Sequence, residues 1–116
     1  MATGTIKNNG WKLLWTNPNP TASFAAQDVL VDLSNVNLVA IQYRNSTSNA
    51  AIDLTTIAKV GDKGNASVFN WSLNFRSYEI FSNKVTFTGA TYYNAVAQSG
   101  TQNNALLIPI RIYSVP

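Results

Sequence analysis

Apolar and polar residues alternate in short segments along most of the chain. The clearest segment is 69–76, in which Phe69, Trp71, Leu73 and Phe75 alternate with Asn70, Ser72, Asn74 and Arg76. Residues two apart on a β-strand share a face, whereas on a helix the same residues would scatter around the circumference. The segment therefore predicts one strand, with the large apolar side chains on a buried face and Arg76 on the polar face.

The same alternation predicts several more strands. Their inward rows are Trp11–Leu13–Trp15, Val29–Val31–Leu33, Val39–Ile41–Tyr43, Ile52–Leu54–Ala58–Val60, Val85–Phe87 and Leu106–Ile108–Ile110–Ile112. Stretches rich in Asn, Ser, Gly and Pro separate these rows, as expected of turns. Short strands at such intervals predict an all-β fold, a single antiparallel β-sandwich or jelly-roll-like domain with about eight strands. We expect this domain to span residues 1–116, with residues 1–9 as an extended N-terminal arm.

The last predicted strand carries two unusual features. Pro109 cannot donate a backbone hydrogen bond, which predicts an edge strand, a bulge or an unpaired N–H side at this point. Leu107 and Tyr113 add apolar groups to the face that should be polar, and a second apolar face implies a cover. We therefore expect Leu107, Arg111 and Tyr113 to lie at an interface with another subunit.

The composition argues against an enzyme. The chain of 116 residues is 46% hydrophobic and 11% charged, and it contains neither Cys nor His. A thiolate metal site and a disulfide are therefore excluded, and the commonest metal ligand and general base are missing. Serines are frequent, but a nucleophilic serine needs a base. The sequence predicts a non-enzymatic protein without catalytic residues, metal or cofactor.

Charge and hydropathy argue against nucleic acid and membranes as partners. The formal net charge of +3 comes from 8 basic and 5 acidic residues that are scattered along the chain. Binding to phosphates needs a clustered basic face, so nucleic-acid binding is not expected. The apolar runs are far shorter than the ~20 residues that span a bilayer, so membrane insertion is not expected either.

Tyr92 and Tyr93 are candidate glycan-binding residues. Adjacent strand residues face opposite sides, so one of the two should point outward, in a polar stretch where sugars can stack on an aromatic face. An edge tyrosine with its hydroxyl in water is the alternative. For Trp11, Trp15 and Trp71, core packing is the better interpretation. A carbohydrate-binding module that recognises host cell-surface glycans is therefore the alternative function.

The two ends of the chain carry a resemblance. Residues 10–33 open with GWKLLWTNPNPTASFAAQ, and residues 103–113 read NNALLIPIRIY. These ends resemble the opening and closing strands of a small β-domain of tailed-bacteriophage and prophage structural proteins, of the type "WxLLWTNPNPTxxFAAQ … IPxRIYG". This chain departs from that pattern at Ser114, where the family has glycine. No catalytic or binding residue is carried over from the family.

The resemblance implies a virion structural protein, namely a receptor-facing fibre, tail or head-decoration module. It also implies a location in the virion after synthesis in the cytoplasm of the bacterial host. The expected partners are further copies of the chain in a homotrimer, other virion proteins and a host surface glycan.

Overall fold

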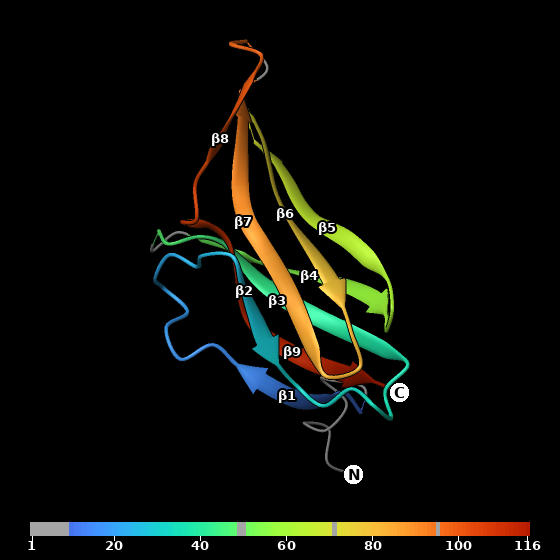
Figure 1. The fold of residues 1–116 in the computed structure, drawn as a ribbon. Coiled ribbons are helices and arrows are strands. Elements are labelled where there is room, and N and C mark those ends of the chain that lie inside the picture. The colour runs from blue at the N-terminus through green and yellow to red at the C-terminus, as the bar shows by residue number, and fades with distance from the viewer. Residues whose placement is uncertain (1–9, 49–50, 71, 95) are drawn as a thin grey trace.

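The computed structural model describes residues 10–48, 51–70, 72–94 and 96–116. In these residues the chain is all β, and two antiparallel sheets pack against each other (Figure 1). This confirms the predicted sandwich, with nine strands in the described residues where about eight were expected. The proposed arm of residues 1–9 and the predicted core residue Trp71 lie outside the described residues.

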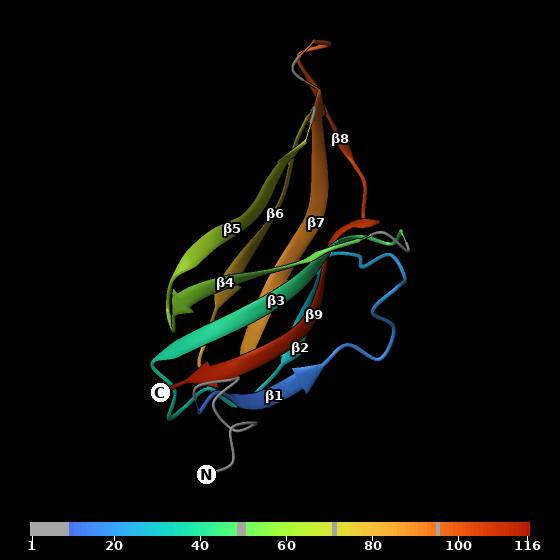
Figure 2. The same cartoon turned by 180° about the vertical axis from the view of Figure 1, so that it is seen from behind.

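The two sheets differ in extent. The first has the order β1-β9-β3-β4 and consists of β1 (Lys12–Thr16), β9 (Leu106–Val115), β3 (Leu38–Ser46) and β4 (Asp53–Lys59). The second has the order β2-β7-β6-β5, with β8 also paired to β7. Its strands are β2 (Gln27–Leu30), β7 (Lys84–Asn94), β6 (Ser72–Ile80), β5 (Lys63–Asn70) and β8 (Ser99–Gln102). Figure 2 shows that β5, β6 and β7 continue beyond the first sheet.

The core lies between the sheets and contains most of the predicted inward rows. The buried members are Val29, Val31, Leu33, Val39, Ile41, Tyr43, Val85, Phe87, Ile108, Ile110 and Ile112. A chain of edge-to-face aromatic contacts crosses this core from Trp15 through Phe24 and Phe87 to Tyr43, with ring centroids 6.4, 5.7 and 6.3 Å apart. Ile52 was predicted to join the core but is 64% exposed, because β4 begins only after it.

The inward row predicted for the first strand is wrong in part. The pairing of β1 with β9 shifts register between Leu13 and Trp15, so two successive residues, Leu14 and Trp15, both pack on the core. Leu13 instead points outward and is 50% exposed. Trp11 precedes the strand, and its ring packs on Tyr113 at 5.8 Å, outside the core cluster.

The single strand predicted for residues 69–76 is also wrong. β5 ends at Asn70 and β6 begins at Ser72, so the segment contains the end of one strand and the start of its antiparallel neighbour. Phe69 is 74% exposed and Leu73 is 38% exposed. Arg76, which was assigned to the polar face, is completely buried. Phe69 and Leu73 therefore belong to a face of the second sheet that the first sheet does not cover.

Pro109 lies at a bulge in a central strand. β9 runs between β1 and β3, and its register with β3 shifts where Gln42 and Tyr43 face Arg111 and Pro109. The bulge is confirmed and the edge position is wrong. The assignment of Leu107 to a subunit interface is wrong as well, because its side chain is completely buried in the core of the single chain. Leu107 has a φ of +48°, in the left-handed region, which turns its side chain inward next to that of Ile108.

Candidate recognition surface

The second sheet extends into a projecting arm. Ala66, Arg76 and Ala90 stand side by side on β5, β6 and β7 and are all completely buried. Beyond this row the three strands continue without an opposing sheet, and β8 runs along β7 (Figures 1 and 2). We call the described residues within 67–75 and 91–102 the arm. It gives the molecule its long axis, with extents of 51 × 30 × 22 Å.

The arm carries no charged side chain. Residues 67–75 and 91–102 consist of Ser, Thr, Asn, Gln, Tyr, Phe, Leu, Val, Ala, Gly and Trp. One face carries the cross-strand row Phe69–Leu73–Tyr93–Gly100, and the other carries Val68–Asn74–Tyr92–Thr101. Mixed aromatic, hydroxyl and amide groups of this kind suit a neutral polar ligand, because they offer flat apolar contact together with adaptable hydrogen bonds.

The structure places both predicted glycan-binding tyrosines on this arm. Tyr92 and Tyr93 lie on opposite faces of β7, and each is 36% exposed. The sequence predicted that one of them points outward, whereas both reach solvent because neither face of the arm is covered by a sheet. Tyr92 stands beside Asn74 and Thr101, and Tyr93 stands beside Leu73 and Gly100.

Asn94 organises the tip of the arm. Its Oδ1 accepts hydrogen bonds from the backbone N–H groups of Val96 at 2.9 Å and Ala97 at 3.1 Å. Such an Asx turn closes the chain tightly before Gln98, which has a φ of +55°. Val96 is 97% exposed at this turn. The arm therefore presents an apolar side chain at its end.

Arg76 anchors the base of the arm. Its Nε donates to the Leu107 carbonyl at 2.8 Å, and its Nη1 donates to the Thr88 carbonyl at 2.7 Å. Its Nη2 donates to the Leu106 carbonyl at 3.0 Å and reaches that of Asn104 at 3.5 Å. One side chain thus ties β6 to β7 and to the start of β9.

The guanidinium has no acidic partner among the described residues. Its charge is met by backbone carbonyls and by the ring of Phe24, whose centroid lies 5.3 Å from Cζ. Burial lowers the pKa of Arg76 to about 10, so the side chain remains charged at neutral pH. Leu107 is held in its left-handed conformation at this same point, where its carbonyl accepts from Arg76.

The sequence contains one signal that points to Arg76. Tyr78 and Ile80 are buried and lie two and four residues after Arg76 on the same strand, so all three share the inward face. The apolar phase of the sequence changes from odd to even numbers between Phe75 and Tyr78. The register of β6 with β7 shifts at that place, between Arg76 and Tyr78. The extra residue of this bulge lies on β7, where Phe87 and Ala90 are three apart, so β6 itself keeps its even residues inward across the shift.

The two terminal motifs of the sequence meet in one structural joint. β1 and β9 pair antiparallel, and Asn17, directly after β1, is buried. The Asn17 Nδ2 donates to the Pro109 carbonyl at 2.8 Å, and its Oδ1 accepts from the Asn19 N–H at 2.7 Å. Phe24 of the first motif covers Arg76, which in turn binds the carbonyls of Leu106 and Leu107 in the second motif.

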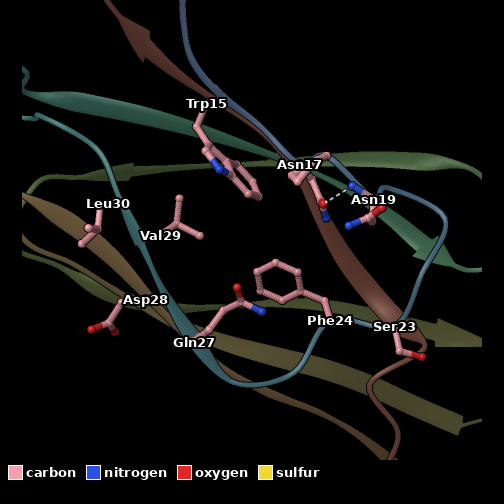
Figure 3. A pocket seen from close by; sticks show the side chains of 10 residues that line it. Trp15, Asn17, Asn19, Ser23, Phe24, Gln27, Asp28, Val29 and Leu30 are labelled. Carbon is pink, nitrogen blue, oxygen red and sulfur yellow. Dashed lines mark hydrogen bonds between the residues drawn. The ribbon is translucent and has the colours of Figure 1, made fainter.

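A shallow hollow of about 340 Å³ opens beside this joint (Figure 3). Trp15, Phe24, Val29 and the Gln27 amide turn toward the same space from β1, β2 and the loop between them. The polar groups at its rim are largely engaged within the chain, since Gln27 donates to the Ala25 carbonyl and Asn17 binds Asn19. The hollow is therefore better explained by packing than by ligand recognition.

The other two predicted interface residues lie on the outer face of the first sheet. Arg111 and Tyr113 alternate with the buried Ile110 and Ile112, so their side chains point away from the core, and both are half-buried. Arg111 donates to the Gln42 Oε1 at 2.8 Å. Across the same face runs an apolar row that consists of Leu13, Tyr113, Ala40 and Ile57, one residue from each strand of the sheet.

Within the described residues, no group of three or more acidic, histidine or cysteine side chains gathers as metal ligands do. No helix that could span a membrane occurs in the same part of the chain. Comparison of the chain with models of protein families, with curated proteins and with solved structures finds no match in any of the three.

Proposed function

We propose that the chain is a non-enzymatic structural module of a tailed-bacteriophage particle, and that its uncharged arm faces the host. The observation that carries the receptor-facing role is the arm itself, an uncovered extension of one sheet that presents aromatic and amide side chains away from the sandwich. A rigid base with an open tip is how a structural scaffold exposes a binding surface.

The phage assignment rests on the resemblance of the two terminal motifs. Their residues pair as β1 and β9, and they share the contacts of Asn17, Phe24 and Arg76. These contacts explain in structural terms why the two motifs would occur together, since a change in either motif would disturb the same joint. The resemblance is thus supported by a structural unit, and the sandwich is the kind of fold that it implies.

Immunolabelling of purified particles tests this proposal. An antibody raised against the chain should decorate a fixed position on negatively stained virions, and the chain should co-purify with them. An antibody against the arm alone should label intact particles before they attach to cells, because the arm is expected to point outward. Absence of the chain from purified particles would overturn the proposal.

A carbohydrate-binding module is the second candidate function, favoured by Tyr92 and Tyr93. Both rings are partly exposed on an uncharged surface, and Tyr92 stands beside the amide of Asn74 and the hydroxyl of Thr101, which is the chemistry that stacks on and hydrogen-bonds neutral sugars. On a glycan array, Tyr92→Ala or Tyr93→Ala should lose most of the signal. Phe81→Ala is the matched control, because Phe81 is 38% exposed but lies outside the arm. A flat array with the unaltered chain would exclude this function.

A further inference from the structure

We propose that β4 is a pairing edge for a second copy of this chain, related by a two-fold axis at Thr56. β4 is the last strand of the first sheet, and it pairs with β3 on one side only. Strands at the edge of a sheet expose a row of backbone donors and acceptors that can pair with another chain. This inference is independent of the proposed function.

The backbone groups that face the open edge can be identified from the pairing with β3. Two hydrogen bonds flank the strand in the same register, from the Asn45 N–H to the Ile52 carbonyl and from the Val60 N–H to the Asn37 carbonyl, both 2.9 Å. Hydrogen-bonded pairs alternate along an antiparallel ladder. The even residues of β4 therefore bond to β3, and the odd residues direct their N–H and C=O groups outward. These odd residues are Asp53, Thr55, Ile57 and Lys59.

The order of these side chains is complementary to itself. In an antiparallel pair of two β4 strands centred on Thr56, Asp53 stands opposite Lys59 of the second copy, and Thr55 stands opposite Ile57. All four are odd residues whose backbone N–H and C=O groups point outward. The register that places Asp53 opposite Lys59 therefore also allows backbone hydrogen bonds between the two strands. Each dimer would contain the Asp53–Lys59 pair twice, as a two-fold axis requires.

The two charges are available for such a pair. The side chains of Asp53 and Lys59 are exposed, and neither makes an ion pair within the described residues. Arg44 stands opposite Asp53 on β3, but its Nη2 donates to the Ser48 carbonyl at 2.9 Å. The strand also has no proline and no bulge, two of the devices by which edges prevent pairing, and its two edge charges are of opposite sign.

The other edges lack this complementarity. β1 and β5 each contain a single charged residue, Lys12 and Lys63, and β8 contains none. The one charged residue of β2, Asp28, already pairs with Lys84 at 3.2 Å. Pairing through β4 would also bring Ile57 diagonally next to Ile57 of the second copy. The apolar row that starts at Leu13 and ends at Ile57 would then continue across eight strands.

Charge reversal tests the inference on the full chain by analytical ultracentrifugation at low salt. The unaltered chain should sediment as a dimer of twice 12.6 kDa. Asp53→Lys or Lys59→Asp alone places like charges opposite each other twice per dimer and should raise the dimer Kd at least about ten-fold. The double variant Asp53→Lys/Lys59→Asp should restore dimerisation, whereas Lys63→Asp on β5 is the control and should change nothing.

A backbone readout separates edge pairing from any other association. Amide hydrogen exchange at Thr55 and Ile57 should slow as protein concentration rises, while the amides of Leu54 and Thr56 should stay protected at every concentration. Thr55→Pro should abolish the dimer and leave the fold intact, because it removes only an outward N–H. The inference is overturned by a monomer throughout, by a trimeric mass that survives the single reversals, or by a folded double variant that stays monomeric.

Discussion

The arm and its base share the strands β5, β6 and β7, yet they differ in charge and in burial. At the base, Arg76 is completely buried and bonded to backbone carbonyls, and Phe24 covers its guanidinium. In the arm there is no charge at all, and Phe69 is 74% exposed. The comparison teaches that the position of the arm is fixed by contacts below it. Largely exposed side chains of the arm, such as those of Phe69 and Val96, take little part in these contacts.

Removal of the buried cation should break this arrangement most severely. Arg76→Ala removes the side-chain donor to the Leu106, Leu107 and Thr88 carbonyls and opens a cavity under Phe24, so we expect a loss of about 3–5 kcal/mol in the free energy of unfolding. Urea denaturation measures it. Arg76→Lys is the control, since it keeps the charge but loses the planar set of guanidinium donors. Its free energy of unfolding should lie between those of the unaltered chain and the alanine variant. A loss below about 1 kcal/mol for the alanine variant would show that the base does not depend on this side chain.

The joint between the terminal motifs should give the next largest effect. Asn17→Ala removes the buried bond to the Pro109 carbonyl and the bond to the Asn19 N–H, which should cost about 1–3 kcal/mol in urea denaturation. Asn19→Ala is the matched control, because that residue is exposed and contributes its backbone N–H to the contact. Equal losses in the two variants would contradict a specific role for the Asn17 amide.

Sequence patterning predicted the core rows well wherever the strand itself carries no extra residue. Val39, Ile41 and Tyr43 are all buried as expected, because a period of two fixes the face of a regular strand. Some errors fall at bulges, where one extra residue reverses the phase, and others fall at strand ends such as Ile52 and Phe69. The bulge between Leu13 and Trp15 exchanged the faces of Leu13 and Leu14, and the bulge at Pro109 accompanies the inward turn of Leu107.

The candidate site was predictable only in its exposed part. Tyr92 and Tyr93 stood out because two adjacent aromatic residues in a polar stretch cannot both be buried by one sheet face. The role of Arg76 as the anchor of the arm could not be predicted from the sequence. Its partners are backbone carbonyls, which every residue carries, so no residue type in the sequence indicates them. The absence of charge over residues 91–102 is evident in the sequence. It indicates a recognition surface only once the structure shows that β7 and β8 pair along the arm.

Aromatic residues of the two regions should respond very differently to truncation. Phe69→Ala in the arm should change the free energy of unfolding by no more than about 0.5 kcal/mol, because the ring is largely in solvent already. Phe87→Ala is the matched core variant, and it should cost about 3–5 kcal/mol because its ring is only 1% exposed. Chemical denaturation of both variants measures the difference. A large loss for Phe69→Ala would mean that the arm contributes to the stability of the sandwich.

The smallest effect concerns pH, and it should belong to the sandwich alone. The Asp28 carboxylate accepts from the Thr86 hydroxyl at 2.7 Å and from the Lys84 Nζ at 3.2 Å, and these hydrogen bonds hold its pKa below the ordinary value of an aspartate. A carboxyl group whose pKa is lower in the folded state stabilises the fold above its unfolded pKa, and that contribution is lost as the pH falls through the folded pKa.

Thermal melts between about pH 6 and pH 2 should therefore show a Tm that falls below about pH 4, and Asp28→Asn should make this fall shallower. The Asp32 carboxyl, whose pKa is lowered by its bonds to the Ser34 hydroxyl and N–H, should contribute in the same direction. Phe69→Ala is the control, because the arm has no carboxyl group and the variant should reproduce the pH profile of the unaltered chain. If Asp28→Asn followed that profile too, the contact between β2 and β7 would have no part in the response to acid, and the loss would have to come from other carboxyl groups of the sandwich.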